Sequence, residues 1–229
     1  MRLKITIGLA AVMAVLTAGS AMAQTKKYEI NVGGGFTAAT GDIEEHFGNG
    51  GHIEGGFTFF PRETFGLQFQ YAYTKLNGKD FQLAVSDNPG GAAINRDFAS
   101  HMHMHGFSFD AVIKPKFKEG LYFVAGPGIY HRTVSVTTPS VGFVTVCDPY
   151  WFVCFDTPTT VDRLLGDRSS TDFGINAGGG YAFKISDSAK LYVEARYLYV
   201  FGPDVVINGV KKASNANGQF IPLSLGIRW

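Results

Sequence analysis

The last nine residues of the sequence follow a strict period of two. The apolar side chains are Ile221, Leu223, Leu225, Ile227 and Trp229, and small, polar or charged residues stand between them. Successive side chains of a β-strand point to opposite faces, so this stretch predicts a strand with one apolar and one polar face. A terminal aromatic residue is typical of the boundary between an apolar membrane layer and water. The pattern favours the closing strand of a membrane β-barrel.

The same alternation recurs in seven earlier segments. They predict strands at residues 28–37, 53–59, 65–74, 103–114, 121–133, 172–183 and 190–199. The third segment alternates over ten residues, which a helical period does not accommodate. The phase of 121–133 stays open, because Leu121, Tyr122, Phe123 and Val124 are apolar on both faces. Charged residues make up 17% of the chain, below the roughly 25% of soluble domains, which also favours a membrane protein.

The predicted connections alternate in length. Residues 61–64, 115–120 and 185–188 are short turns, whereas 39–51, 76–100, 134–170 and 202–218 are long. All short turns would therefore lie at one end of an up-and-down barrel, as they do in outer-membrane barrels with long extracellular loops. We predict an all-β protein, an eight-stranded antiparallel up-and-down transmembrane β-barrel with both chain ends at the periplasmic side. A soluble lipocalin-like barrel would instead turn its apolar face inward around a ligand.

The size of the side chains predicts which face lines the lumen. Eight strands enclose room for side chains only. Glycines gather on one face, and large aromatic residues such as Phe57, Phe69 and Tyr71 on the other, so the aromatic face is expected to meet lipid. The inner face then carries six charged residues, Glu54, Asp110, Lys190, Glu194, Arg196 and Arg228. We interpret them as an ionic network that plugs the lumen, since unpaired buried charges are costly; a narrow channel for small solutes or ions is the alternative.

The N-terminal residues predict a secretory signal peptide. Arg2 and Lys4 are followed by an apolar run at 5–16 and by Ala21-Met22-Ala23, a small-residue cleavage site. The apolar run is shorter than the roughly 20 residues of a membrane-spanning helix. We therefore expect residues 1–23 to be a signal peptide and residues 24–229 to form the barrel domain. The charges of that domain are nearly balanced, which gives no reason to expect a nucleic-acid partner.

Residues 171–181, the hairpin into 191–197 and the closing segment 221–229 resemble the small OmpA/OmpX-like outer-membrane β-barrel domain family. The resemblance implies insertion into the outer membrane of a Gram-negative-type envelope from the periplasm, after signal cleavage. It also implies that the barrel-assembly machinery reads Leu223, Leu225, Ile227 and Trp229, although Phe is the commoner last residue. Members of the family serve as anchors, in adhesion and in resistance to host defence. We expect a monomer in outer-membrane lipid, with a structural or surface-interaction role and an extracellular partner at its long loops.

Cys147 and Cys154 lie in the longest predicted connection. In an oxidising compartment, two cysteines at this spacing predict a disulfide that closes an eight-residue ring. The ring would present an apolar tip at residues 150–153, which would dock on lipid, on a neighbouring loop or on a partner.

Three alternating histidines, His101, His103 and His105, are weak candidates for a metal site. Neighbours on one strand face are about 7 Å apart, too far to share one ion, so we expect contacts with lipid headgroups instead. His131 and Ser135 could form the base and the nucleophile of a hydrolytic site, but no motif supports this pair. The sequence therefore predicts neither catalysis nor a cofactor, and an outer-membrane lipid-modifying enzyme is the remaining alternative.

Overall fold

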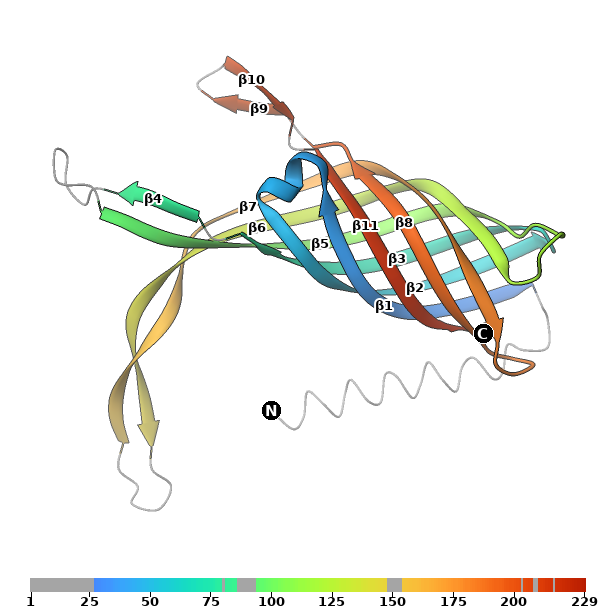
Figure 1. Ribbon diagram of the computed structural model, residues 1–229, viewed down its shortest axis with the longest axis horizontal. Helices are drawn as coiled ribbons and strands as arrows, with labels where there is room; N and C mark the ends of the chain where they lie inside the picture. Colours follow the sequence, from blue (N-terminus) through green and yellow to red (C-terminus); the bar gives the residue numbers. More distant parts are fainter. Residues whose placement is uncertain are drawn as a thin grey trace.

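The computed structural model describes residues 27–79, 81–85, 94–147, 154–202, 204–207, 210–215 and 217–229. Eight of its strands pair in the order β1-β2-β3-β5-β6-β7-β8-β11, each antiparallel to its neighbours (Figure 1). The pairing of β1 with β11 joins the first strand to the last and closes the cylinder. The predicted eight-stranded antiparallel up-and-down barrel is confirmed. The expected signal peptide at 1–23 lies outside the described residues.

The barrel strands differ widely in length. They are β1 (Tyr28–Thr40), β2 (Phe47–Arg62), β3 (Phe65–Gly78), β5 (Ile94–Ile113), β6 (Leu121–Cys147), β7 (Cys154–Lys184), β8 (Lys190–Val200) and β11 (Gly218–Arg228). The other elements are the 3-10 helix η1 (Gly41–Glu45) and the short strands β4 (Phe81–Val85), β9 (Asp204–Ile207) and β10 (Val210–Asn215). We call the end with the β2–β3, β5–β6 and β7–β8 connections the turn end, and the opposite end the hairpin end (Figure 1).

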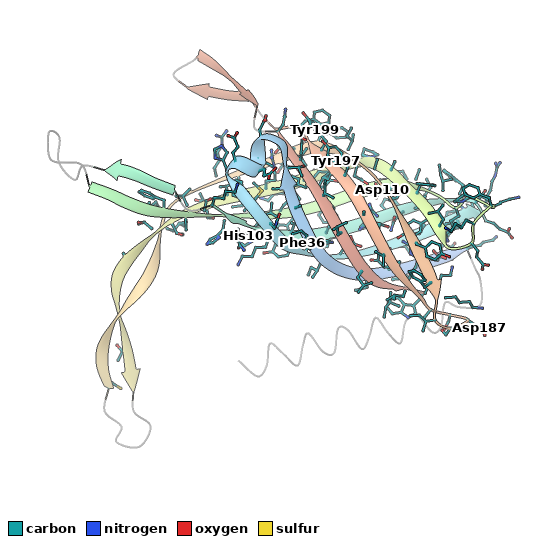
Figure 2. All side chains as sticks on the ribbon, viewed as in Figure 1. Phe36, His103, Asp110, Asp187, Tyr197 and Tyr199 are labelled. Carbon is teal, nitrogen blue, oxygen red and sulfur yellow. The ribbon has the colours of Figure 1, made fainter. Side chains whose placement is uncertain are left out.

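Alternation along each barrel strand separates the lumen from the outer surface. In β8, Glu194 and Arg196 are buried, whereas Val193 and Tyr197 are exposed. Aromatic side chains such as Phe69 project from the outer wall, as the sequence predicts, and Figure 2 shows side chains around the whole cylinder. The structure also shows which residues of 121–133 face the lumen, a point that the sequence left undecided. Even-numbered residues of β6 up to Arg132 face the lumen and odd-numbered ones face outward.

The lumen is filled by large side chains that fit against glycines. The ring of Tyr192 lies beside Gly226, its register partner on β11, where a Cβ atom would come within 2.6 Å of the ring. Gly180 stands in the same relation to Tyr122, whose hydroxyl would be 2.5 Å from an added Cβ. Glycine is required at these two positions because a partner ring occupies the space that any side chain would need.

The bounds predicted for the long connections are largely wrong, because much of each predicted connection is regular structure. Residues 39–51 contain only the turn of η1 between β1 and β2. The segment 134–170 continues β6 and β7, whose ladder runs to the pair Cys147 and Cys154. β4 pairs with the first residues of β5, and β9 pairs with β10 as a separate hairpin. Figure 1 shows these hairpins projecting beyond the barrel from the hairpin end.

Candidate functional site

Arg196 of β8 is the centre of the lumen. Its guanidinium donates hydrogen bonds to Glu194 on the same strand and to Gln70 on β3. It also donates to Asp110 Oδ2 on β5 at 2.8 Å, and Asp110 is fully buried. Asn176 of β7 donates to the other oxygen of Asp110 at 2.8 Å. Charge-assisted bonds of this kind are among the stronger ones in proteins, and here they join strands from opposite walls of the barrel.

Glu54 of β2 extends the network across the lumen. Gln70 Nε2 donates to Glu54 Oε2 at 2.7 Å, and the Tyr192 hydroxyl donates to Glu54 Oε1 at 2.8 Å. Gln68 donates to the Asn31 side chain at 3.0 Å next to this layer. The buried carboxylate and the amides of this layer are satisfied by these contacts, so the middle of the barrel is a packed polar core.

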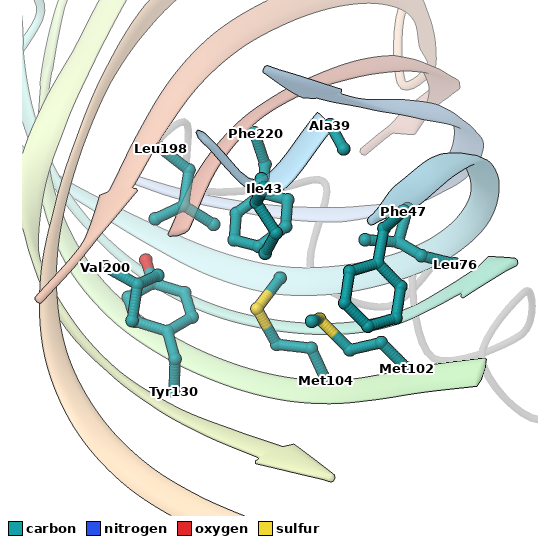
Figure 3. Packing of buried hydrophobic residues seen from close by; sticks show 10 residues of the cluster. All are labelled: Ala39, Ile43, Phe47, Leu76, Met102, Met104, Tyr130, Leu198, Val200 and Phe220. Carbon is teal, nitrogen blue, oxygen red and sulfur yellow. The ribbon is translucent and has the colours of Figure 1, made fainter. Parts of the chain in front are cut away.

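Towards the hairpin end, polar pairs give way to an apolar cluster. His52 is hydrogen-bonded to Thr37 at 2.9 Å and to Ser224 at 2.8 Å, and Arg132 forms an ion pair with Asp172 at 2.6 Å. Beyond them, buried apolar side chains close the mouth (Figure 3): Ala39, Ile43, Phe47, Leu76, Met102, Met104, Tyr130, Leu198, Val200 and Phe220. Between this cluster and Arg196 lies a cavity of about 50 Å³, which has room for only a few water molecules.

At the turn end, Glu29 of β1 collects three cations. Lys114 lies 2.9 Å and Lys190 also 2.9 Å from Glu29 Oε1, and Arg228 Nη1 lies 3.9 Å from Glu29 Oε2. Arg228 stacks on Tyr122, with its guanidinium carbon 4.4 Å from the ring centre. Burial lowers the pKa of Lys114, in the connection after β5, to about 8, although the attraction of Glu29 opposes this shift.

The structure brings the six predicted lumen charges to the inner wall. Glu54, Asp110, Glu194, Arg196 and Arg228 are buried, whereas Lys190 is half-exposed at the turn end. Sequence reasoning missed Glu29, the central acceptor of the turn end, and the pair of Arg132 with Asp172. Arg132 lies on β6, for which the sequence did not decide which residues face the lumen. The signal for Glu29 was present in β1, where it alternates with the outward-facing Tyr28 and Ile30.

The three histidines of β5 face away from the lumen, whereas Met102 and Met104 between them are buried. His103 is hydrogen-bonded to Tyr73 at 2.7 Å and His105 to Tyr71 at 2.9 Å. Among the described residues, no group of three or more His, Cys, Asp or Glu side chains is arranged to hold a metal ion.

His131 does not meet Ser135. Its Nδ1 is hydrogen-bonded to Thr171 at 2.8 Å, and Ser135 stands opposite Asp167, four residues further along β6. Four residues of extended chain separate the two side chains by about 13 Å. The hydrolytic arrangement sketched from the sequence is therefore not formed.

The remaining predicted residues lie at the two ends of the molecule. Cys147 and Cys154 are direct Cα partners in the last pair of the β6–β7 ladder. Leu223, Leu225 and Ile227 are exposed on the outer face of β11, and Trp229 is joined to Ile30 of β1 by two backbone hydrogen bonds. The tip at 150–153 lies outside the described residues. Within the described part of the chain, no helix is both long and apolar enough to cross a membrane.

Comparison with known proteins shows which barrels this chain is similar to. No curated protein matches the chain by sequence. Among solved structures, the chain is similar to Ail, the attachment invasion locus protein of Yersinia pestis (13% identity, 88% of this chain and 97% of that chain, TM-score 0.47). It is also similar to a major outer membrane protein from Thermus thermophilus (15%, 89% and 98%, TM-score 0.47) and to OprG from Pseudomonas aeruginosa (10%, 91% and 99%, TM-score 0.45).

The family comparison covers nearly the whole chain. Residues 8–228 match the family described as "Outer membrane protein beta-barrel domain". The closed barrel with an apolar outer wall and a polar, side-chain-filled lumen is the architecture of such proteins. The chain belongs to the outer membrane protein β-barrel domain family.

Proposed function

We propose that this protein is a plugged outer-membrane anchor that presents the extended β6–β7 hairpin at the cell surface for interaction with an extracellular partner. The observation that carries the proposal is the length of the β6–β7 ladder. β5 accompanies β6 only as far as the pair Ala99 and Thr137, and the ladder with β7 continues from there to Cys147. At about 3.3 Å per residue this part alone extends about 33 Å.

The exposed side chains of this hairpin support an interaction role. Leu164 and Leu165 are adjacent, each more than half exposed, at the register shift where the ladder leaves the barrel. β7 pairs with β8 only from Gly174 onward, and the Phe173 carbonyl accepts from Phe201 N. Before Phe173, β7 has no second strand neighbour among the described residues. A free strand edge with apolar side chains is a surface on which partners add a strand or pack.

The membrane orientation belongs to the proposal. The turn end faces the periplasm and the hairpin end faces outward, with Leu223, Leu225, Ile227 and Trp229 read by the barrel-assembly machinery after removal of the signal peptide. Outer-membrane barrels of this kind have short periplasmic turns and longer extracellular segments. His101, His103 and His105 then lie towards the outside, on the outer wall beyond Phe107, where they contact lipid headgroups.

Two alternatives are less well supported. A channel requires a continuous path, whereas the lumen holds the Arg196 network and, beyond it, the apolar cluster. For a lipid-modifying enzyme, the one nucleophile and base pair that the sequence suggests, Ser135 and His131, is not formed.

Cross-linking in intact cells tests the interaction role. A photo-reactive residue at Leu164 is expected to form adducts with a surface macromolecule. The matched control is Ile185, which is similarly exposed but lies in the β7–β8 turn at the other end. Adducts at Ile185 and none at Leu164 would contradict the proposal, and so would a complete absence of adducts.

A further inference from the structure

A large cavity opens at the turn end, opposite the surface hairpin. Its volume is about 900 Å³, which is the size of a small-molecule site. Six cationic side chains line it: Lys114, Lys116, Lys118, Lys184, Lys190 and Arg228. Only three acidic residues stand among the described lining residues, and Glu29 is the one that is largely buried. The cavity wall therefore carries an excess of positive charge.

The excess is concentrated around Glu29. This single carboxylate is the shared partner of Lys114, Lys190 and Arg228. The second acid near Arg228 in the described part of the chain is Glu194. Its Oε1 accepts from Arg196, and its Oε2, which has no hydrogen-bond partner among the described residues, lies 3.8 Å from Arg228 Nη2. Glu29 is shared by three cations, and Glu194 is shared by Arg228 and Arg196. The cationic side chains around the floor of the cavity therefore outnumber the carboxylates that they contact.

Arg228 is buried at the floor of this cavity with some of its hydrogen-bond donors unsatisfied. It is 2% exposed, and its Nε and Nη2 atoms have no hydrogen-bond acceptor among the described residues. Burying a guanidinium with unmet donors is costly, and a nearby anion reduces that cost.

We propose that this cavity binds a phosphate-bearing anion. The ammonium groups of Lys114 and Lys190 contact the anion, because their side chains are 26% and 44% exposed. Arg228 lies beneath them and adds its charge from the floor. The phosphate belongs either to a free solute or to the headgroup of an anionic phospholipid at the barrel rim, since both present the same oxygens to the lysines.

Calorimetric titration with pyrophosphate at pH 7 tests the site in the refolded full barrel. The wild-type protein is expected to bind one pyrophosphate. Lys190→Gln should weaken binding roughly three- to tenfold through loss of one close charge. Lys75→Gln is the matched control, since Lys75 is exposed on β3 near the hairpin end, and it should leave the affinity unchanged. No saturable binding, or equal affinity in Lys190→Gln, would overturn the proposal.

Glu29→Gln separates a binding site from a purely structural cluster. Removal of the competing carboxylate should strengthen pyrophosphate binding, while Lys114→Gln should weaken it, with folding of both variants checked by the heat-modifiable gel shift. Weaker binding in folded Glu29→Gln would contradict the assigned roles.

Nanodiscs distinguish the two sources of the phosphate. In phosphatidylcholine alone, pyrophosphate should bind as in detergent. Addition of phosphatidylglycerol should weaken that binding if the lipid headgroup occupies the cavity, and leave it unchanged if the natural ligand is a free solute. Either result is compatible with the site, whereas failure to bind pyrophosphate in phosphatidylcholine nanodiscs would count against it.

Discussion

The side chain of Arg196 on β8 links two other strands of the barrel, β5 and β3, across the lumen. Its partners Asp110 and Gln70 come from β5 and β3, on the far side of the lumen from β8. Replacement of only one member of such a network leaves the others buried and unpaired. The loss of stability on replacing one such residue therefore comes mainly from the buried partners that are left without a counter-charge or hydrogen bond.

Arg196→Ala is expected to destabilise the barrel by about 3–5 kcal/mol, because Asp110 and Glu194 lose their counter-charge. The midpoint of the heat-modifiable gel shift measures this effect, and Arg168→Ala, at an exposed arginine of β7, is the control. Planar-bilayer recordings on the same proteins should show little change. A large, well-defined conductance with unchanged stability would identify Arg196 as a gate instead.

Gly226→Ala is expected to destabilise the barrel by about 1–3 kcal/mol through overpacking. Its Cβ would lie 2.4 Å from the Val32 carbonyl oxygen as well as against Tyr192. Gly55→Ala is a matched control within the barrel, since the nearest atom would be 3.8 Å away. Equal thermal midpoints for the two variants would show that the Tyr192 ring is not fixed in this position.

At the scale of elements, the sequence predicts strands well wherever one face is buried and poorly elsewhere. The alternation of β8 and β11 reports contact with lipid on one side and with the lumen on the other. Beyond Thr137, β6 has no barrel strand beside it other than β7, and the sequence of this extension carries no sustained period of two. Its threonine- and valine-rich composition was the available signal, because β-branched residues favour strands.

The candidate site was predicted in outline for the same reason. Residues that alternate with lipid-facing neighbours, such as Glu194 and Arg196, are found on the inner wall by their phase alone. Partners across the lumen depend on register and barrel closure. The contact of Arg196 with Asp110 joins residues 86 positions apart, and no local pattern reports such a pair.

A disulfide between Cys147 and Cys154 is expected at the end of the hairpin. Direct register partners bring two Cβ atoms to the separation that a disulfide requires. The bond would stabilise the terminal turn by about 2.5 kcal/mol in the loop-entropy estimate. Mass spectrometry of peptides prepared without reduction should detect the linked pair, and two free thiols in protein from the cell envelope would refute it.

At the scale of the whole molecule, the two ends of the barrel differ in chemistry. The hairpin end is closed by apolar packing and extends into paired ribbons, whereas the turn end is open and cationic. The Arg196 network lies between them in the lumen. This division predicts that changes in the hairpin leave the barrel folded and that changes at the turn end leave surface interaction intact.

The location of the β6–β7 hairpin in living cells directly tests the proposed membrane orientation. An epitope inserted into the β6–β7 turn, between residues 148 and 153, should bind antibody on intact cells. The same epitope at Asp187, in the β7–β8 turn, should bind only after the outer membrane is permeabilised. Labelling of the Asp187 epitope on intact cells, with the hairpin epitope protected, would contradict the proposed orientation and the surface role with it.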